Sequence, residues 1–491
     1  MGIIARQASK NLIFIVLGFL AGAVNTLIVL PNAFENDPEN WGLLRSLVAW
    51  FMILSQLFSF GSTNVIIRYF ARYEERPGPL LQFGLLVAGL GITLLAVLVF
   101  GFGESLIALS NGEHIHLLSD HLGLLFLLAA NFVVFLTFQG FVNAIFKSVF
   151  HQFLNETFLK SYYLAICAAY WLGWLNFEQL LFALAVGYIL ASAALVVYSK
   201  RFGFNLKGSL KRLDEKREKI TYGLYSILDR GAQTIVNNLD VIMIGLIIGL
   251  DDVGLFTLAA YVGTVTQMPQ RAIQVIANPI VSKAIETRDY DDLRNVYLES
   301  ALNQLILGGA IFLGIWVSID ELMSLMPGQY GNGKWVVFLI GLSKLFYTAS
   351  GVSGAMIVYS QFFRTNLHLN LALIVLTIIS NYVLISPDYF NWGIEGAALA
   401  TAITYFIYNA AKLIFVKGKF GLNPLTGKTL IVTALLALIA TGFHMWSPAW
   451  NAFIAIAVKS AVSMAIFGAI IYITKLSPEL NKLVANALKK R

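Results

Sequence analysis

The chain has 491 residues, of which 58% are apolar and only 12% are charged, and its formal net charge is +7. Soluble domains carry about one quarter charged residues, so this composition excludes a water-soluble globular protein of the same size. Cys167 is the single cysteine, which excludes an intramolecular disulfide and a cysteine-based metal site. We therefore expect a membrane protein whose side chains mostly face lipid or one another.

Apolar stretches long enough to cross a bilayer recur along the whole chain. A hydrocarbon core about 30 Å thick calls for about 20 apolar residues in each crossing helix. The first stretch follows Arg6 and Lys10 and is longer than the core of a signal peptide, so we expect it to be retained. The sequence predicts about 14 crossings, at residues 11–31, 42–67, 80–102, 122–146, 157–175, 179–199, 220–249, 253–281, 296–318, 335–360, 365–385, 393–416, 428–446 and 451–474.

Lysine and arginine gather in every second connection between these crossings. Arg68, Arg72 and Arg76 lie in one such connection, and a longer basic cluster covers residues 200–219. Cytoplasmic loops carry an excess of both residues, so we predict an even number of crossings with both termini in the cytoplasm. Because the basic residues are spread over all the inner connections, they favour anionic lipid headgroups over nucleic acid as partners.

Three short similarities relate the first half of the chain to the second. They join KRFGFN at 200–205 with GKFGLN at 418–423, FHQFLNETFLK at 150–160 with YSQFFRTNLHL at 359–369, and Trp41-Gly-Leu-Leu with Val253-Gly-Leu-Phe. Their order is the same in both halves, and their offsets differ by about ten residues. The matches favour two similar bundles that repeat in parallel, as in many transporters, although an unrelated helical bundle stays an alternative.

The repeat predicts an all-α integral membrane protein with two pseudo-symmetric lobes of six helices each. The predicted parts are an N-lobe at 1–205, a basic cytoplasmic linker at 206–219, a C-lobe at 220–423, and two further crossings with a basic tail at 424–491.

Two stretches carry the features of a known family. The stretch 237–285 contains Asp240, a proline pair at Pro269 and Pro279, and glycines at Gly245, Gly249 and Gly254. The second stretch, NWGIEGAALATAITY at 391–405, is rich in glycine and alanine. Both resemble helices of the bacterial oligosaccharide flippases, the Wzx-type polysaccharide biosynthesis proteins. That family belongs to the MOP exporter superfamily, together with the lipid II flippases and the MATE multidrug extruders.

The resemblance implies a transporter and not an enzyme. Its cargo would be a polyprenyl-diphosphate-linked oligosaccharide, moved by alternating access from the inner to the outer leaflet of the cell inner (cytoplasmic) membrane. The product would serve surface polysaccharide or lipopolysaccharide O-antigen synthesis. The implied partners are membrane lipids and the glycan polymerase and glycosyltransferases of the same pathway.

Basic residues inside the predicted crossings are candidates for binding the diphosphate, and they are Arg45, Arg230, Arg271 and Lys344. An ionised group at mid-bilayer costs at least about 2.5 kcal/mol, so it usually faces water or a partner. Arginine matches phosphate oxygens in a fork and keeps its proton. The structural alternatives are an ion pair of Arg271 with Asp240, an ion pair of Arg230 with Asp229, and snorkelling of Arg45, Lys344 and Lys459 to the outer headgroups.

Asp240 lies near the middle of its crossing with Asn237 and Asn238 beside it. These oxygens could bind Na⁺, or the aspartate a proton, and so couple an ion gradient to transport; pairing of Asp240 with Arg271 is the alternative. We expect no other cofactor. His114 and His116 lie in an outer loop without further ligands at suitable spacing, so we expect a solvated loop and no metal site.

Two other functions fit the composition less well. A cation-coupled multidrug extruder of the same superfamily would carry an acidic residue in the first crossing, which offers only Asn25. A membrane polymerase or ligase of lipid-linked glycans would need a large catalytic outer loop, whereas the longest predicted one covers residues 102–121. The sequence also has no glycine-rich phosphate loop and no nucleophile elbow.

Overall fold

The computed structural model describes residues 3–482 except 74, 76, 111, 203, 205, 207–213, 215, 447 and 449; the side chains of residues 3–12, 228–230, 275 and 444 are also outside the description. The described residues form helices joined by short connections, and their only strand-like feature is one isolated backbone bridge between Glu113 and Gly249. The predicted all-α fold class is confirmed.

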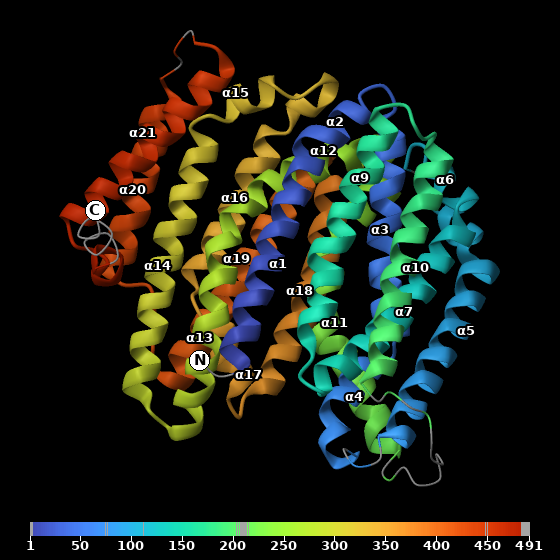
Figure 1. Ribbon diagram of the computed structural model, residues 1–491. Coiled ribbons are helices and arrows are strands. Elements are labelled where there is room, and N and C mark those ends of the chain that lie inside the picture. The colour runs from blue at the N-terminus through green and yellow to red at the C-terminus, as the bar shows by residue number, and fades with distance from the viewer. Residues whose placement is uncertain are drawn as a thin grey trace. The chain divides into compact units, whose positions relative to one another are not determined.

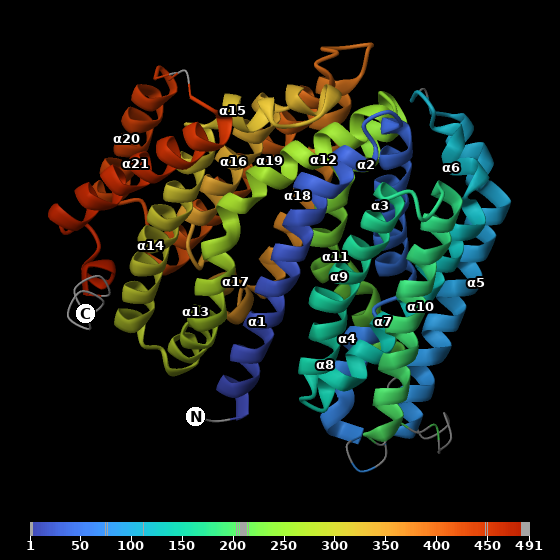
Figure 2. The same ribbon diagram turned by 45° about the horizontal axis from the view of Figure 1, so that its top comes forward.

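The chain divides into two compact units, and the first is Met1–Gly254. Its helices are shown in Figures 1 and 2. They are α1 (Ile3–Val24), η1 (Asn25–Val29), α2 (Leu30–Ala33), α3 (Pro38–Phe58), α4 (Ser62–Tyr69), η2 (Phe70–Tyr73), α5 (Gly78–Ala108), α6 (His116–Asp120), α7 (Leu122–Ala144), α8 (Ser148–Gln152), η3 (Phe153–Phe158), α9 (Leu159–Trp171), α10 (Phe177–Arg201), α11 (Lys216–Ile247) and the start of α12 (Leu250–Thr264).

The second unit, Leu255–Arg491, continues α12 and ends with a helix pair that packs on α14 (Figure 1). Its further helices are η5 (Val265–Gln267), α13 (Met268–Thr287), α14 (Tyr290–Trp316), α15 (Ile319–Ser324), η6 (Gly328–Asn332), α16 (Lys334–Ala349), α17 (Ser353–Tyr359), α18 (Phe363–Ile385), α19 (Gly393–Phe420), α20 (Gly427–His444) and α21 (Ala452–Ile473).

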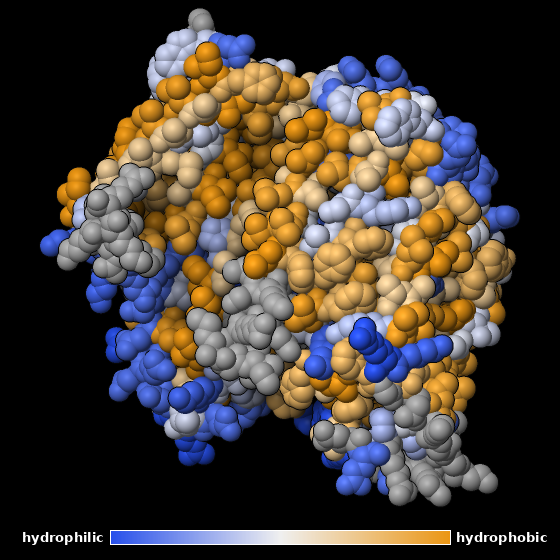
Figure 3. All heavy atoms as spheres, viewed as in Figure 1, coloured by the Kyte–Doolittle hydropathy of each residue, from blue (hydrophilic) through white to orange (hydrophobic). Residues whose placement is uncertain are grey.

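The helices have the length and surface of a multi-pass membrane protein. Within the described residues, nine helices are long and apolar enough to span a bilayer, or ten if α16 and α17, which meet at a 54° bend, are one span. Figure 3 shows hydrophobic side chains over α20 and α21 and hydrophilic ones where α13 meets α14. Each of the predicted crossings coincides with a helix or a run of joined helices, while their number, fourteen, stays a prediction.

Local sequence signals set the helix ends. Asn176 caps α10, because its Oδ1 accepts from the Gln179 backbone N–H at 2.8 Å and Gln179 Oε1 accepts from the Asn176 N–H at 2.9 Å. Gly421 ends α19 in the left-handed conformation, with φ of +70°. Gly351 takes φ of +59° at the bend between α16 and α17, where a β-carbon would be strained.

Small residues bring α11 and the start of α12 against α3 in the first unit. A β-carbon on Gly42 would lie 1.8 Å from the Leu250 carbonyl oxygen, and one on Gly231 would lie 3.0 Å from the Gln56 side chain. The first compact unit therefore includes α11, although the sequence predicts a lobe boundary at 206–219. The boundary at 206–219 separates two similar stretches of sequence, whereas the two compact units are defined by their contacts. The sequence boundary therefore stays a prediction.

The end of the predicted basic linker is the first turn of α11. Lys219 is buried, with its Nζ 4.7 Å from the ring centroid of Tyr69 and 2.6 Å from the Asp214 carbonyl oxygen that it donates to. The Tyr69 hydroxyl donates to Glu218 Oε1 at 2.7 Å. These contacts fix the start of α11 on α4, while residues 207–213 and 215 of the linker lie outside the described residues.

Two backbone hydrogen bonds join the loop after α5 to the α11–α12 junction. The Glu113 N–H donates to Ile248 O at 2.9 Å, and the Leu250 N–H donates to Glu113 O at 3.0 Å. His114 Nδ1 lies 3.1 Å from Asp251 Oδ1, and this hydrogen bond raises the pKa of His114. His114 is thus hydrogen-bonded to a carboxylate. Among the described residues, no group of three or more His, Cys, Asp or Glu side chains is placed to bind a metal ion.

Candidate site in the membrane-spanning helices

Arg45 is held in the middle of the first unit by a neutral partner. It is half-buried on α3, and its Nη2 donates to Asn238 Oδ1 on α11 at 3.0 Å. Tyr163 of α9 and Tyr188 of α10 lie within electrostatic reach of the guanidinium. Among the described residues no carboxylate forms an ion pair with Arg45. Arg45 is therefore bound to a neutral amide, and none of the carboxylates that the structure describes pairs with it. This hydrogen bond to α11 does not match the snorkelling alternative.

The asparagines beside Asp240 point in different directions. Asn238 is buried and uses its oxygen for Arg45, while its Nδ2 donates to Thr234 O at 2.9 Å. Asn237 is exposed and accepts from Gln233 Nε2 at 3.0 Å. Adjacent helix residues are turned by about 100°, so the two amides cannot share one ion with Asp240 without rearrangement. Asp240 is half-buried and already takes part in an interaction.

Arg230 cannot be placed in the site. Its side chain, like that of Asp229, lies outside the described side chains, so its predicted role and the alternative pair both stay predictions.

The second unit brings three basic residues together around tyrosine rings. We call this set the Tyr347 cluster; it consists of Arg271, Lys344, Tyr347, Tyr405, Tyr408 and Lys412. Lys344 Nζ lies 3.9 Å from the ring centroid of Tyr405, whose ring is 6.2 Å from that of Tyr347. Lys412 Nζ lies 4.0 Å from the ring of Tyr408 and 6.0 Å from that of Tyr347. Cations over aromatic faces gain about 0.5–2 kcal/mol from the ring quadrupole.

Arg271 reaches the same cluster from α13. Its guanidinium lies within electrostatic reach of Tyr347 and of Tyr261, and its side chain is exposed. The helix is broken just before it, since η5 covers Val265–Gln267 and Pro269 opens α13. Arg271 thus lies in the first turn of α13, directly after this break.

The Tyr347 cluster has no carboxylate to balance it among the residues of the second unit that the structure describes. Within the described residues of the second unit, no Asp or Glu forms an ion pair with Arg271, Lys344 or Lys412. Lys344 and Lys412 are only 7% and 5% exposed. Snorkelling of Lys344 to the headgroups is thus wrong, because its amine ends on a buried ring. The pairing of Arg271 with Asp240 would join the two units and stays a prediction.

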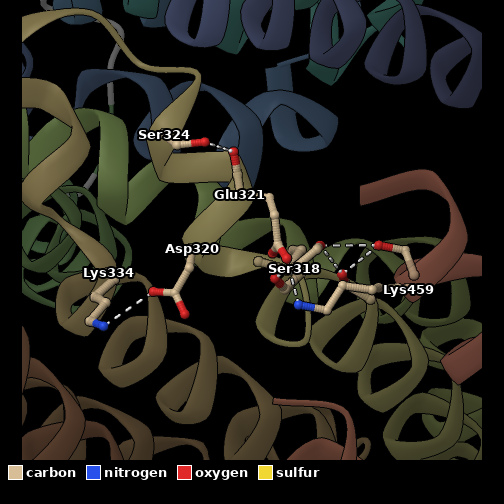
Figure 4. A network of polar contacts seen from close by, with 9 residues as sticks. Ser318, Asp320, Glu321, Ser324, Lys334 and Lys459 are labelled. Atoms are coloured by element: carbon tan, nitrogen blue, oxygen red, sulfur yellow. Dashed lines mark hydrogen bonds and ion pairs between the residues drawn. The ribbon is translucent and has the colours of Figure 1, made fainter. Parts of the chain in front are cut away.

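Lys459 is the contrasting case. It is 4% exposed on α21, and its Nζ lies 2.7 Å from Glu321 Oε1 on α15 (Figure 4). Ser460 donates to Gly314 O at 2.7 Å beside this pair, and Ser318 lies 3.1 Å from Ser460. The predicted snorkelling of Lys459 is therefore wrong. This lysine ties α21 to the rest of the second unit and is no candidate for an anion.

A model of one protein family matches residues 8–285, which is more than half of the chain, and its description is polysaccharide biosynthesis protein. The chain belongs to this family. One curated relative is the probable low-salt glycan biosynthesis flippase Agl15 of Haloferax volcanii, 24% identical over 237 residues. The match covers 48% of this chain and 48% of that protein, so the chain spans about half the length of that relative.

Two solved transporter structures have a fold similar to that of this chain. The lipid II flippase MurJ in an inward closed conformation has a TM-score of 0.71 at 13% identity, covering 96% of this chain and all of its own. An inward-facing MATE multidrug resistance transporter of the MOP superfamily has a TM-score of 0.62 at 14% identity, covering 84% of this chain and 98% of its own. The predicted fold, shared with a lipid II flippase and a MATE transporter, is confirmed.

Lys412 and the tyrosines of the Tyr347 cluster are candidate site residues that the sequence analysis did not single out. Lys412 lies near one end of the predicted crossing at 393–416, and α19 continues past it to Phe420. The signal was present in the spacing, because Tyr405, Tyr408 and Lys412 follow one another at steps of three and four, which places them on one helix face. Tyr347 likewise follows Lys344 by three residues.

Proposed function

We propose that this chain is a flippase that moves a polyprenyl-diphosphate-linked oligosaccharide from the inner to the outer leaflet by alternating access. Surface polysaccharide or O-antigen synthesis in the cell inner membrane is the proposed setting, with both termini cytoplasmic. The family match and the fold shared with a lipid II flippase support transport of a lipid-linked glycan.

The observation that carries the proposal is that Arg45, Arg271 and Lys344 are balanced by no carboxylate in the described part of their own unit. Arg45 bonds a neutral amide, Arg271 lies within electrostatic reach of Tyr347, and Lys344 lies over the ring of Tyr405. Ionised groups in a bilayer are costly unless they meet water or a partner of opposite charge. A cargo whose diphosphate carries two negative charges would supply that partner, and a guanidinium holds such oxygens in two parallel hydrogen bonds.

A coupling ion and pathway partners belong to the same proposal. Uptake of Na⁺ or H⁺ near Asp240 would drive the cycle, provided that Asn237 and Asn238 rearrange from their present hydrogen bonds. The polymerase and glycosyltransferases of the pathway would supply and consume the cargo at the two membrane faces.

Deletion of the gene tests the proposal in cells. We expect lipid-linked oligosaccharide to accumulate and to stay protected from glycan-degrading enzymes added outside, because its sugar is stranded on the inner face. Surface glycan should be lost, whereas loss of a polymerase would shorten its chains instead. A deletion strain with normal surface glycan would contradict the proposal.

A multidrug extruder is the second candidate, since the MATE transporter shares the fold. The first crossing argues against it, because residues 13–33 carry no acidic residue and Asn25 is buried. Resistance to cationic dyes on overexpression, with unchanged surface glycan in the deletion strain, would favour the extruder.

A further inference from the structure

An apolar pocket lies between helices of the first unit. Its volume is about 240 Å³, and its eleven lining residues are all hydrophobic or glycine. They come from α3, α5, α6, α7 and α11. Leu54, Val99 and Leu125 form the deep part of the wall, and none of them is more than 7% exposed. A ligand that contacts these three side chains therefore has to lie inside the pocket.

The pocket opens onto the surface that faces lipid. Three of its helices, α3, α5 and α7, are long and apolar enough to span a bilayer, and α5 lies along the edge of the first unit in Figures 1 and 2. Leu106 of α5 lines the pocket and is also 54% exposed, so the mouth lies beside it. Phe102 and Leu109, about one turn before and after Leu106, are exposed as well. Hydrocarbon chains of the bilayer thus reach the mouth directly.

The lining favours hydrocarbon over water. A buried water molecule needs roughly two to four hydrogen-bond partners, and the lining offers no polar side-chain group other than the indole N–H of Trp50. A dry apolar cavity of about 150 Å³ holds one benzene molecule, so a pocket of about 240 Å³ has room for about ten carbon atoms. The lining residues of α5 run from Leu98 to Ile107, about 14 Å along the helix axis, so the space suits the end of a chain.

Bilayer phospholipids are the source of such chains that fits best. The mouth faces the bilayer, where acyl chains are the solvent and outnumber any lipid that is present in small amounts. Occupancy rises with the concentration of a ligand relative to its Kd, so even a weak affinity for acyl chains fills the pocket. None of the lining residues is charged, so nothing in the pocket itself prefers a chain that carries a diphosphate.

One wall of the pocket belongs to the contact between α11 and the loop after α5. Leu246 of α11 lines the pocket, and its carbonyl oxygen accepts a hydrogen bond from the Gly112 N–H at 3.0 Å. The two segments approach so closely that a β-carbon on Gly112 would lie 2.1 Å from the Gly245 carbonyl oxygen. A chain between α5 and Leu246 would add dispersion contacts next to this hydrogen bond.

We propose that this pocket binds the end of one acyl chain of a bilayer phospholipid. The bound chain packs against α5, α7 and Leu246, and so stabilises the contact of α11 with the loop after α5. The second acyl chain and the headgroup stay in the bilayer. The inference goes beyond the proposed function and does not depend on it, since it concerns a lipid of the membrane and not the cargo.

Photolabelling of the full chain in lipid vesicles tests this inference. The vesicles consist of phosphatidylethanolamine and phosphatidylglycerol, with a trace of phosphatidylethanolamine that carries a diazirine at the end of one acyl chain. After illumination, mass spectrometry of peptides locates the label. We expect label on Leu54, Val99 and Leu125, which lipid outside the pocket does not reach, in addition to the exposed face of α5.

Matched variants on α5 separate the pocket from the lipid-facing surface. Leu98→Trp and Ile107→Trp place a ring in the pocket, and each should reduce the label on the three deep residues about tenfold or more. Leu90→Trp makes the same substitution on the exposed face and should keep the parental labelling. Unfolding temperatures in detergent show which variants are folded. Added phospholipid should raise this temperature more for the parent protein and Leu90→Trp than for the two pocket variants.

Three outcomes would overturn the inference. They are label confined to exposed residues such as Phe102, undiminished label on the deep residues in a folded pocket variant, and displacement of the label by polyprenyl diphosphate but not by an equal excess of unlabelled phospholipid. The last outcome would assign the pocket to the chain of the cargo. None of them depends on glycan flipping, whereas failure of the proposed function would appear in the deletion strain as normal surface glycan.

Discussion

The ion pair between Lys459 and Glu321 makes a direct prediction about how α21 is held. Lys459→Met keeps the length of the side chain and removes its charge. Glu321 then keeps a carboxylate whose Oε1 has lost its partner at 2.7 Å and whose Oε2 is buried without a hydrogen-bond partner. The substitution should destabilise the second unit.

The size of the effect follows from burial. Removing one partner of a buried ion pair costs about 3–5 kcal/mol, because the other charge is left uncompensated. The Glu321 side chain is 17% exposed, so we place the free-energy cost near the lower bound, about 3 kcal/mol. The double variant Lys459→Met with Glu321→Gln removes both charges, and it should recover all but about 1 kcal/mol, the typical value of one hydrogen bond.

The same region offers a matched control. Lys334 lies 3.1 Å from Asp320, but these side chains are 41% and 57% exposed (Figure 4). Exposed ion pairs contribute about 0–1 kcal/mol, so Lys334→Met should leave stability almost unchanged.

Thermal unfolding in detergent measures both changes. Cys167 is the single cysteine and is buried, so a thiol-reactive dye reports its exposure on heating. We expect Lys459→Met to unfold well below the parent protein and the double variant to recover. Equal unfolding temperatures for Lys459→Met and Lys334→Met would refute the role of burial in this reasoning.

Three further predictions concern the first unit. Gly42→Ala should destabilise the protein by about 1–3 kcal/mol, because the β-carbon would meet the backbone beside it, whereas Gly89→Ala has open space and should be neutral in the same dye assay. The pKa of His114 is raised, so its hydrogen bond to Asp251 should stabilise the folded protein fully below pH 6.5 and lose this effect as the pH rises through the raised pKa. The difference in unfolding temperature between the parent protein and Asp251→Asn should therefore shrink as the pH rises. A difference that stays constant with pH would contradict this prediction. Arg45→Gln should lower flipping about tenfold or more at equal membrane levels, the loss expected for one charged hydrogen bond, and parental activity would remove Arg45 from the site.

The helices could be predicted from the sequence because the bilayer imposes one length and one composition on each of them. The predicted crossing at 80–102 corresponds to α5, and the one at 365–385 corresponds to α18. Their ends differ, since α5 runs on to Ala108 in the outer connection. Helix packing was harder to predict, because the contact of α11 with α3 depends on the absence of a side chain at single glycines such as Gly231.

The site was only partly predictable for a related reason. Hydropathy locates a charge at a depth in the membrane, but it does not say what surrounds it. Lys344 and Lys459 looked alike in sequence, yet one ends on the ring of Tyr405 and the other on the carboxylate of Glu321. Lys412 could not be recognised as a buried cation from the sequence, because it lies near the end of a long helix. Only tertiary packing distinguishes an uncompensated cation from a paired one.

The central claim is that uncompensated cations of the spans receive the anionic group of the cargo. It is tested most directly by reconstituting the full chain in proteoliposomes and measuring the flipping rate of a polyprenyl-diphosphate-linked oligosaccharide for Arg271→Ala and for the α13 control Lys283→Ala. Loss of a charged hydrogen bond predicts a rate at least about tenfold lower for Arg271→Ala, with the control at the parental rate. Parental flipping by a folded Arg271→Ala protein would contradict the account.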